Sequence, residues 1–126
     1  MSANSELSPS QALWLQVGRE LLYWDRYHEH WRASEAAFRN PLPDGQKLGV
    51  TIPSPVTLQA GPDAFLEQRS GVSAVAEFTV QDARDVRQAV MRDPGDLEQG
   101  FVVGPKPRGV RLLLAERSVI RPECPG

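Results

Sequence analysis

The sequence predicts an α+β fold in which a long N-terminal helix packs on a mainly antiparallel sheet of four or five strands, with a second, shorter helix. Large side chains recur at helical spacing between residues 13 and 38. Runs of β-prone residues, separated by turn sequences, follow between residues 46 and 121. A chain of 126 residues is long enough for one domain, expected at residues 9–122 after a disordered tail at residues 1–8.

The long helix is expected at residues 9–39. Ser8 can cap it, Pro9 suits its first position, and no further proline occurs before Pro41. Its apolar face would consist of Leu13, Trp14, Val17, Leu21, Trp24, His28, Trp31 and Phe38. Such a helix would be about 45 Å long at 1.5 Å per residue, so its excess length should pack on a partner. The alternative is a helix broken near Gly18 or Asp25 into a hairpin.

The remaining chain, residues 46–121, should supply the sheet and the second helix. Pro53 and Pro55 interrupt two short β-prone runs, which favours edge strands or a bulge. The other expected elements are a helical turn at 62–68, a strand at 71–79, a helix from Thr79 or Gln81 to Asp93, a hairpin of strands 101–103 and 110–115, and an extended piece at 118–121.

Composition limits the functional classes. Lys and Arg number 14 against 16 Asp and Glu, a formal net charge of −2, so the overall field recruits neither nucleic acid nor membrane. Cys124 is the single cysteine, which excludes an internal disulfide and a cysteine-based zinc site. No signal sequence or apolar stretch of about 20 residues is present, so a soluble, cytoplasmic protein without membrane association is expected.

The segment Trp24–Trp31, W-D-R-Y-H-E-H-W, has the residue types of a metal or catalytic site. On a helix, His28 and His30 would point about 160° apart, so one metal ion could not take both. Asp25 and His28 would share a face and are weak metal-ligand candidates, requiring a second copy to complete a site. The favoured interpretation gives His28 a structural role as a polar residue in an apolar seam. No metal and no cofactor is therefore predicted.

The predicted function is non-catalytic protein–protein interaction or assembly through the aromatic helix. Tryptophan dominates many protein interfaces, and a symmetric dimer is the simplest way to cover an overlong helix. The expected interface residues are Trp14, Trp24, His28 and Trp31, and the expected partner is a second copy or another protein.

Two alternatives belong to other classes. A small hydrolase or nuclease could use His28 with Glu29 or Glu35, although the chain carries no nucleophile-elbow or phosphate-loop motif. Enzymatic activity is thus left open, with non-catalytic function favoured. A basic C-terminal hairpin with Lys106, Arg108 and Arg111 could contact phosphates. That segment has no aromatic residue to stack on bases, so nucleic-acid binding is not favoured.

Overall fold

The computed structural model describes residues 7–42 and 45–125. Its main element is a six-stranded sheet with the order β6-β7-β4-β1-β5-β8, in which each neighbouring pair is antiparallel. The strands are β1 (Ala12–Val17), β4 (Lys47–Thr51), β5 (Ala74–Thr79), β6 (Ala89–Asp93), β7 (Asp96–Val103) and β8 (Val119–Arg121). A separate two-stranded sheet pairs β2 (Leu22–Asp25) with β3 (His30–Ala33).

The predicted α+β mixture is right, but the predicted helix at residues 9–39 is wrong. This segment forms β1, a 3-10 turn η2 (Arg19–Leu21), the β2–β3 hairpin and a second 3-10 turn η3 (Glu35–Phe38). The expected N-cap, Ser8, instead closes a turn by accepting a hydrogen bond from the backbone N–H of Gln11 at 3.0 Å. The first six residues of the predicted disordered tail lie outside the described residues, and Leu7 is buried.

Strand β1 lies inside the sheet, which explains its nearly continuous apolar sequence. Leu13, Leu15 and Val17 enter the main core, whereas Trp14 packs on the opposite face with Phe65 and Val75. One face of the strand is therefore fully covered, and the other is covered at Trp14 but open at Gln16. A strand buried over most of both faces loses the simple alternation of polar and apolar residues, and its sequence resembles that of a buried helix.

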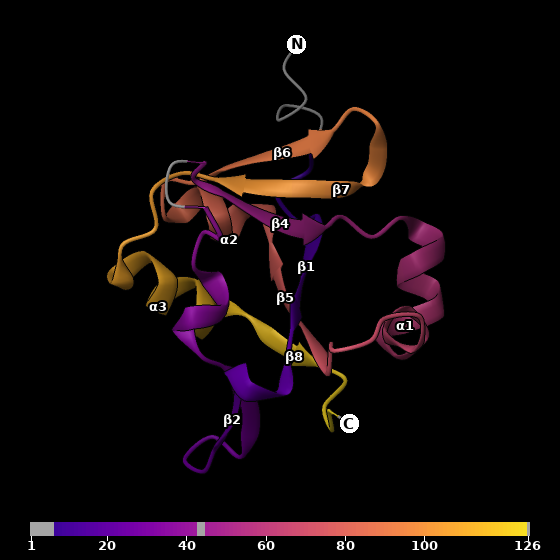
Figure 1. Ribbon diagram of the computed structural model, residues 1–126, viewed down its shortest axis with the longest axis vertical. Helices are drawn as coiled ribbons and strands as arrows, with labels where there is room; N and C mark the ends of the chain where they lie inside the picture. The colour runs from indigo at the N-terminus through magenta and orange to yellow at the C-terminus, as the bar shows by residue number, and fades with distance from the viewer. Residues whose placement is uncertain (1–6, 43–44, 126) are drawn as a thin grey trace.

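Within the described part of the chain, three α-helices cover the two faces of the sheet. Helix α1 (Pro55–Glu67) lies on one side, while α2 (Val80–Asp85) and α3 (Arg108–Arg117) lie on the other (Figure 1). The larger core is on the α2 and α3 side and includes Phe38, Phe78 and Leu114. Helix α1 is kinked at Gly61, whose φ of 91° is unfavourable for other residues. The β2–β3 hairpin projects from the bottom of the sheet as drawn in Figure 1.

The second half of the chain agrees with the prediction in part. Strand β5 falls within residues 71–79, and α2 begins after Thr79 as one of the two expected starts. It ends at Asp85 rather than Asp93, because Arg87 adopts a positive φ of 62° and the chain then enters β6. Strand β4 is central instead of an edge, since Pro53 follows the strand and Pro55 begins α1.

The predicted strand at residues 110–115 is also wrong, because these residues lie in α3. Leucine, alanine, glutamate and arginine are strong helix formers, and they dominate the end of this segment. The predicted hairpin of residues 101–103 and 110–115 is replaced by the β6–β7 hairpin. Within residues 7–42 and 45–125, no helix is both long and apolar enough to cross a membrane.

Candidate functional site

The segment Trp24–Trp31 forms the distal part of the β2–β3 hairpin. Trp24 and Trp31 are cross-strand partners, and their rings meet edge to face with centroids 5.8 Å apart. The guanidinium of Arg19 lies 4.5 Å from the centroid of the Trp31 ring. Trp31 packs against the main core, whereas 51% of Trp24 is exposed. The Trp31 ring is thus fixed against the core, while the Trp24 ring has an exposed surface that another molecule can contact.

Asp25 organises the turn of this hairpin. Its Oδ1 accepts hydrogen bonds from the backbone N–H groups of Tyr27 at 3.0 Å and His28 at 3.2 Å, an arrangement in which aspartate commonly initiates turns. Its Oδ2 lies 2.8 Å from His28 Nδ1 and accepts from Arg32 Nε at 2.6 Å. The hydrogen bond with His28, followed by those from the backbone and Arg32, holds the pKa of Asp25 well below its usual value. Asp25 is therefore ionised at neutral pH.

The hairpin brings both histidines to the same place. The expectation that one ion could not reach both was wrong because it assumed a helix, whereas the turn places the His28 and His30 ring centroids 5.9 Å apart. One nitrogen from each ring and one carboxylate oxygen of Asp25 all lie within 4.8 Å of one another. Among the predicted metal ligands, Asp25 and His28 are in contact, and His30 is the additional residue that the helical projection missed.

An apolar groove runs between the hairpin and the outermost strand, β8. It has a volume of about 550 Å³ and exposes more apolar than polar surface. We call it the hairpin groove; its lining residues are Trp24, Glu29, His30, Trp31, Val119, Ile120, Glu123 and Cys124. Two of them, Trp24 and Val119, are about half exposed. The groove therefore offers an apolar floor with two carboxylates among its walls.

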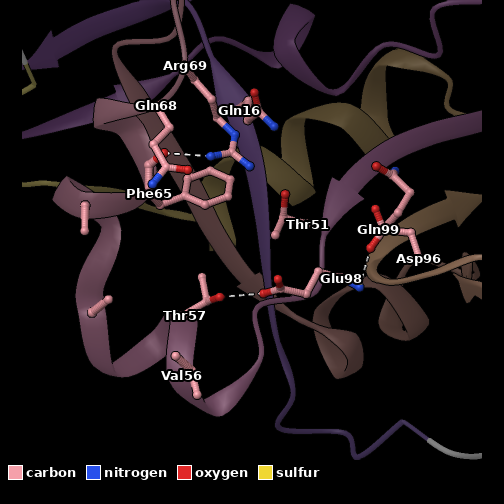
Figure 2. A pocket seen from close by; sticks show the side chains of 12 residues that line it. Gln16, Thr51, Val56, Thr57, Phe65, Gln68, Arg69, Asp96, Glu98 and Gln99 are labelled. Carbon is pink, nitrogen blue, oxygen red and sulfur yellow. Dashed lines mark hydrogen bonds between the residues drawn. The ribbon is translucent and has the colours of Figure 1, made fainter.

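A second, more polar groove lies between α1 and strands β1, β4 and β7 (Figure 2), with a volume of about 340 Å³. Its labelled side chains in Figure 2 include Gln16, Thr51, Phe65, Arg69 and Glu98. Arg69 lies over the Phe65 ring, 3.6 Å from its centroid, and donates from Nη1 to the Phe65 carbonyl at 2.7 Å. The guanidinium is thus held against one wall of the groove.

Glu98 connects the opposite wall of the polar groove to the start of α1. Its Oε1 accepts from the Thr57 hydroxyl at 2.6 Å and from the Ser54 backbone N–H at 3.0 Å. These hydrogen bonds, that from Thr57 being the strongest influence, lower the pKa of Glu98. A carboxylate stabilised in this way is a weak proton acceptor. The contacts of Glu98 therefore anchor α1 to β7.

The structure separates the remaining predicted site residues. Trp14 is only 1% exposed, and its Nε1 donates to Glu77 Oε1 at 2.8 Å, so it is not available to a partner. Glu35 forms an ion pair with Arg111 of α3, which is the main cause of its lowered pKa. Glu29, by contrast, lines the hairpin groove together with His30.

The predicted basic hairpin is not present. Lys106 is buried, and its ammonium group donates to Asn40 Oδ1 at 2.7 Å and to the Val102 carbonyl at 2.8 Å. Arg108 is exposed at the start of α3, while Arg111 forms an ion pair with Glu35. Of these three cations, Arg108 alone is left on the surface for a phosphate.

Sequence reasoning missed the β8 side of the hairpin groove. Val119, Ile120 and Cys124 were assigned no contact with the aromatic segment, and no local pattern connects residues about 90 positions away from it. The proximity of His28 and His30 did have a local signal. Asp25 followed by polar residues, between β-prone Tyr-Trp and His-Trp pairs, is typical of a hairpin turn.

No protein-family description matches this chain, and comparisons with curated proteins and with solved structures give no match. The chemistry of the two grooves and the hairpin turn is therefore the basis for inferring function.

Proposed function

We propose that this protein is a non-catalytic binding module that holds an extended segment of a partner protein in the hairpin groove. The observation that carries the proposal is the position of Trp24, half exposed on a hairpin and lining an apolar groove. Tryptophan in such a position is a characteristic energetic centre of protein interfaces. The neighbouring contact with Trp31 restricts the ring and so lowers the entropic cost of binding.

The charges around the groove favour a particular kind of segment. Glu29 and Glu123 line it, and none of its lining residues is a lysine or an arginine. A partner segment with an aliphatic or aromatic anchor and a nearby lysine or arginine would match both the apolar floor and the carboxylates. The volume of about 550 Å³ is adequate for one or two large side chains.

A peptide-display selection with the full chain tests this proposal. Random peptides are selected on the wild-type protein, and those enriched are measured against Trp24→Ser and against Leu97→Ser. Leu97 is a suitable control because it is 70% exposed on β7, away from the groove residues. We expect peptides that combine an apolar anchor with a basic residue. Their affinity should fall about tenfold or more in Trp24→Ser and stay unchanged in Leu97→Ser, since loss of a central aromatic anchor costs at least about 1–2 kcal/mol.

Two results would overturn the proposal. One is the absence of any enriched peptide that distinguishes wild type from Trp24→Ser while circular dichroism shows both folded. The other is a light-scattering mass of two chains for wild type and one for Trp24→Ser, because the occupant would then be a second copy rather than another protein.

A further inference from the structure

The two histidines at the hairpin tip are arranged as a pair of oriented ligands. In each ring the Nδ1 atom already faces an oxygen: His28 Nδ1 lies 2.8 Å from Asp25 Oδ2, and His30 Nδ1 lies 3.1 Å from the Trp31 carbonyl. A carbonyl oxygen can only accept, so His30 Nδ1 carries the proton in that contact. An ionised carboxylate likewise accepts from His28. These contacts leave the lone pair of a neutral ring on Nε2 in both residues.

This pattern resembles the outer shell of protein metal sites. A metal-binding histidine usually donates its other N–H group to a carboxylate or a backbone carbonyl, which fixes the tautomer and the ring orientation. Here His28 faces a carboxylate and His30 faces a backbone carbonyl. Asp25 is in turn fixed by Arg32 and by two backbone N–H groups, so the carboxylate that orients His28 is itself held in place.

We propose that the tip of the β2–β3 hairpin is a binding site for a divalent transition-metal ion of the Zn²⁺ class, with His28 and His30 as ligands and Asp25 as the residue that positions His28. Imidazole nitrogen is a preferred ligand of Zn²⁺, Cu²⁺ and Ni²⁺, whereas Mg²⁺ and Ca²⁺ prefer oxygen. The proposed metal site adjoins the hairpin groove through His30, which lines it, whereas His28 and Asp25 are not among the groove's lining residues.

The separation of the rings is compatible with one shared ion. Zn–N bonds of about 2.0–2.1 Å place two ligand nitrogens roughly 3–3.5 Å apart around a tetrahedral ion. The ring centroids are 5.9 Å apart, and both residues are exposed, with 64% of the His28 side chain accessible. A small shift of the exposed turn that keeps both Nδ1 contacts can therefore bring the two nitrogens around one ion. Two protein ligands leave the other coordination positions to water or to a group of a bound partner.

The role of Asp25 follows from its existing contacts. Each of its oxygens already has two polar contacts. Oδ1 accepts from two backbone N–H groups of the turn, and Oδ2 contacts the side chains of His28 and Arg32. A carboxylate offers about four lone-pair sites, so direct coordination would require Asp25 to give up one of these contacts. Asp25 is therefore better placed to orient His28 than to bind the metal ion directly.

Titration calorimetry with ZnCl₂ tests the site, using the full chain without a histidine tag. The chain contains only two histidines, so the pair can be examined without background from others. We expect one ion per chain for wild type, with binding weakened about tenfold or more in either His28→Ala or His30→Ala. Asp25→Asn should weaken binding by about ten- to hundredfold, the usual cost of removing an outer-shell partner. Cys124→Ser is the matched control, because Cys124 is exposed and is itself a possible zinc ligand.

A nitrogen-detected NMR spectrum of the imidazole rings supplies a second measurement. Without metal, at a pH where the rings are neutral, both should be protonated on Nδ1, and Zn²⁺ should move the Nε2 resonances of both residues. The site would be disproved if both single histidine variants bind as wild type does, if binding is lost only in Cys124→Ser, or if Zn²⁺ shifts neither Nε2 resonance. The Ala variants keep a surface turn initiated by Asp25, and their circular dichroism reports whether the fold is retained.

Discussion

At the residue scale, the same amino acid has different roles in different positions of this fold. Trp14 fills the space between the sheet and α1, where its ring meets Phe65 edge to face at 5.2 Å. Trp24 lies on the projecting hairpin and is half exposed. The helical spacing predicted that both tryptophans lie on one helix face. In the structure, Trp14 lies on a strand of the main sheet and Trp24 on the separate hairpin, so their surroundings differ.

Replacing Trp14 should reduce stability, whereas replacing Trp24 should mainly reduce binding. Trp14→Ala removes a ring that is 1% exposed together with its hydrogen bond to Glu77. We expect it to lower the free energy of unfolding by about 3–5 kcal/mol, the usual range for a large aromatic residue in a core. Trp24→Ala should cost less, because half of that side chain is already exposed. Urea denaturation measures both, and equal losses in the two variants would contradict the placement of Trp14.

Lys106 gives a pH dependence with a defined sign. Burial lowers its pKa to about 8, while an unfolded chain returns it to about 10.4. Between these values the unfolded state binds more protons, so the free energy of unfolding should rise as the pH increases from about 8 to about 10.4. The rise should be on the order of 1–3 kcal/mol.

Lys106→Met provides the comparison for that measurement. The variant keeps the other titratable groups, so the slope of unfolding free energy against pH in this window should be lost while the remainder of the profile is kept. Denaturant titrations at several pH values measure the slope. The burial of Lys106 would be contradicted if both proteins show the same slope.

At the element scale, the hairpin shows why the sequence was misleading. Trp24 and Trp31 are seven residues apart, a spacing that places two side chains on the same helix face after about two turns. In a hairpin with a four-residue turn, the same spacing makes them cross-strand partners. Periodicity alone cannot separate these structures. The β-prone aromatics and the turn-forming Asp25 were the features that distinguished them.

Elements with a specific start signal were easier to predict. Thr79 accepts from the backbone N–H of Asp82 at 3.1 Å, and Asp82 Oδ2 accepts from the backbone N–H of Thr79 at 2.9 Å. This reciprocal pair defines the beginning of α2. The end of α2 and the start of β6 had no comparable signal, because Val86, Ala89 and Val90 continue an apolar pattern across the boundary.

The capping pair gives a prediction for α2. Thr79→Ala removes the side-chain acceptor and should lower the free energy of unfolding by about 1 kcal/mol, whereas Thr79→Ser retains the hydroxyl and should cost less. Thermal or urea unfolding of the two variants measures the difference. If serine and alanine are equally destabilising, the hydroxyl is not the source of the stabilisation.

At the scale of the whole molecule, strand order brings distant segments together. β8 is the final strand of the sheet and lies next to the projecting hairpin, so residues near 120 complete a groove with residues near 30. The α+β composition and several strands could be predicted from local patterns. The strand order depends on pairings between residues far apart in sequence, and for this reason neither groove could be located from the sequence.

The hairpin groove is the surface that we propose meets a partner. The chain has three tryptophans, and each indole N–H gives its own NMR resonance. Titration of ¹⁵N-labelled protein with a selected peptide should shift the indole resonances of Trp24 and Trp31 and leave that of Trp14 in place, because Trp14 is buried and bound to Glu77. A peptide that shifts Trp14, or the residues around Arg69 and Glu98, while Trp24 and Trp31 stay unchanged would contradict the hairpin groove as the binding surface.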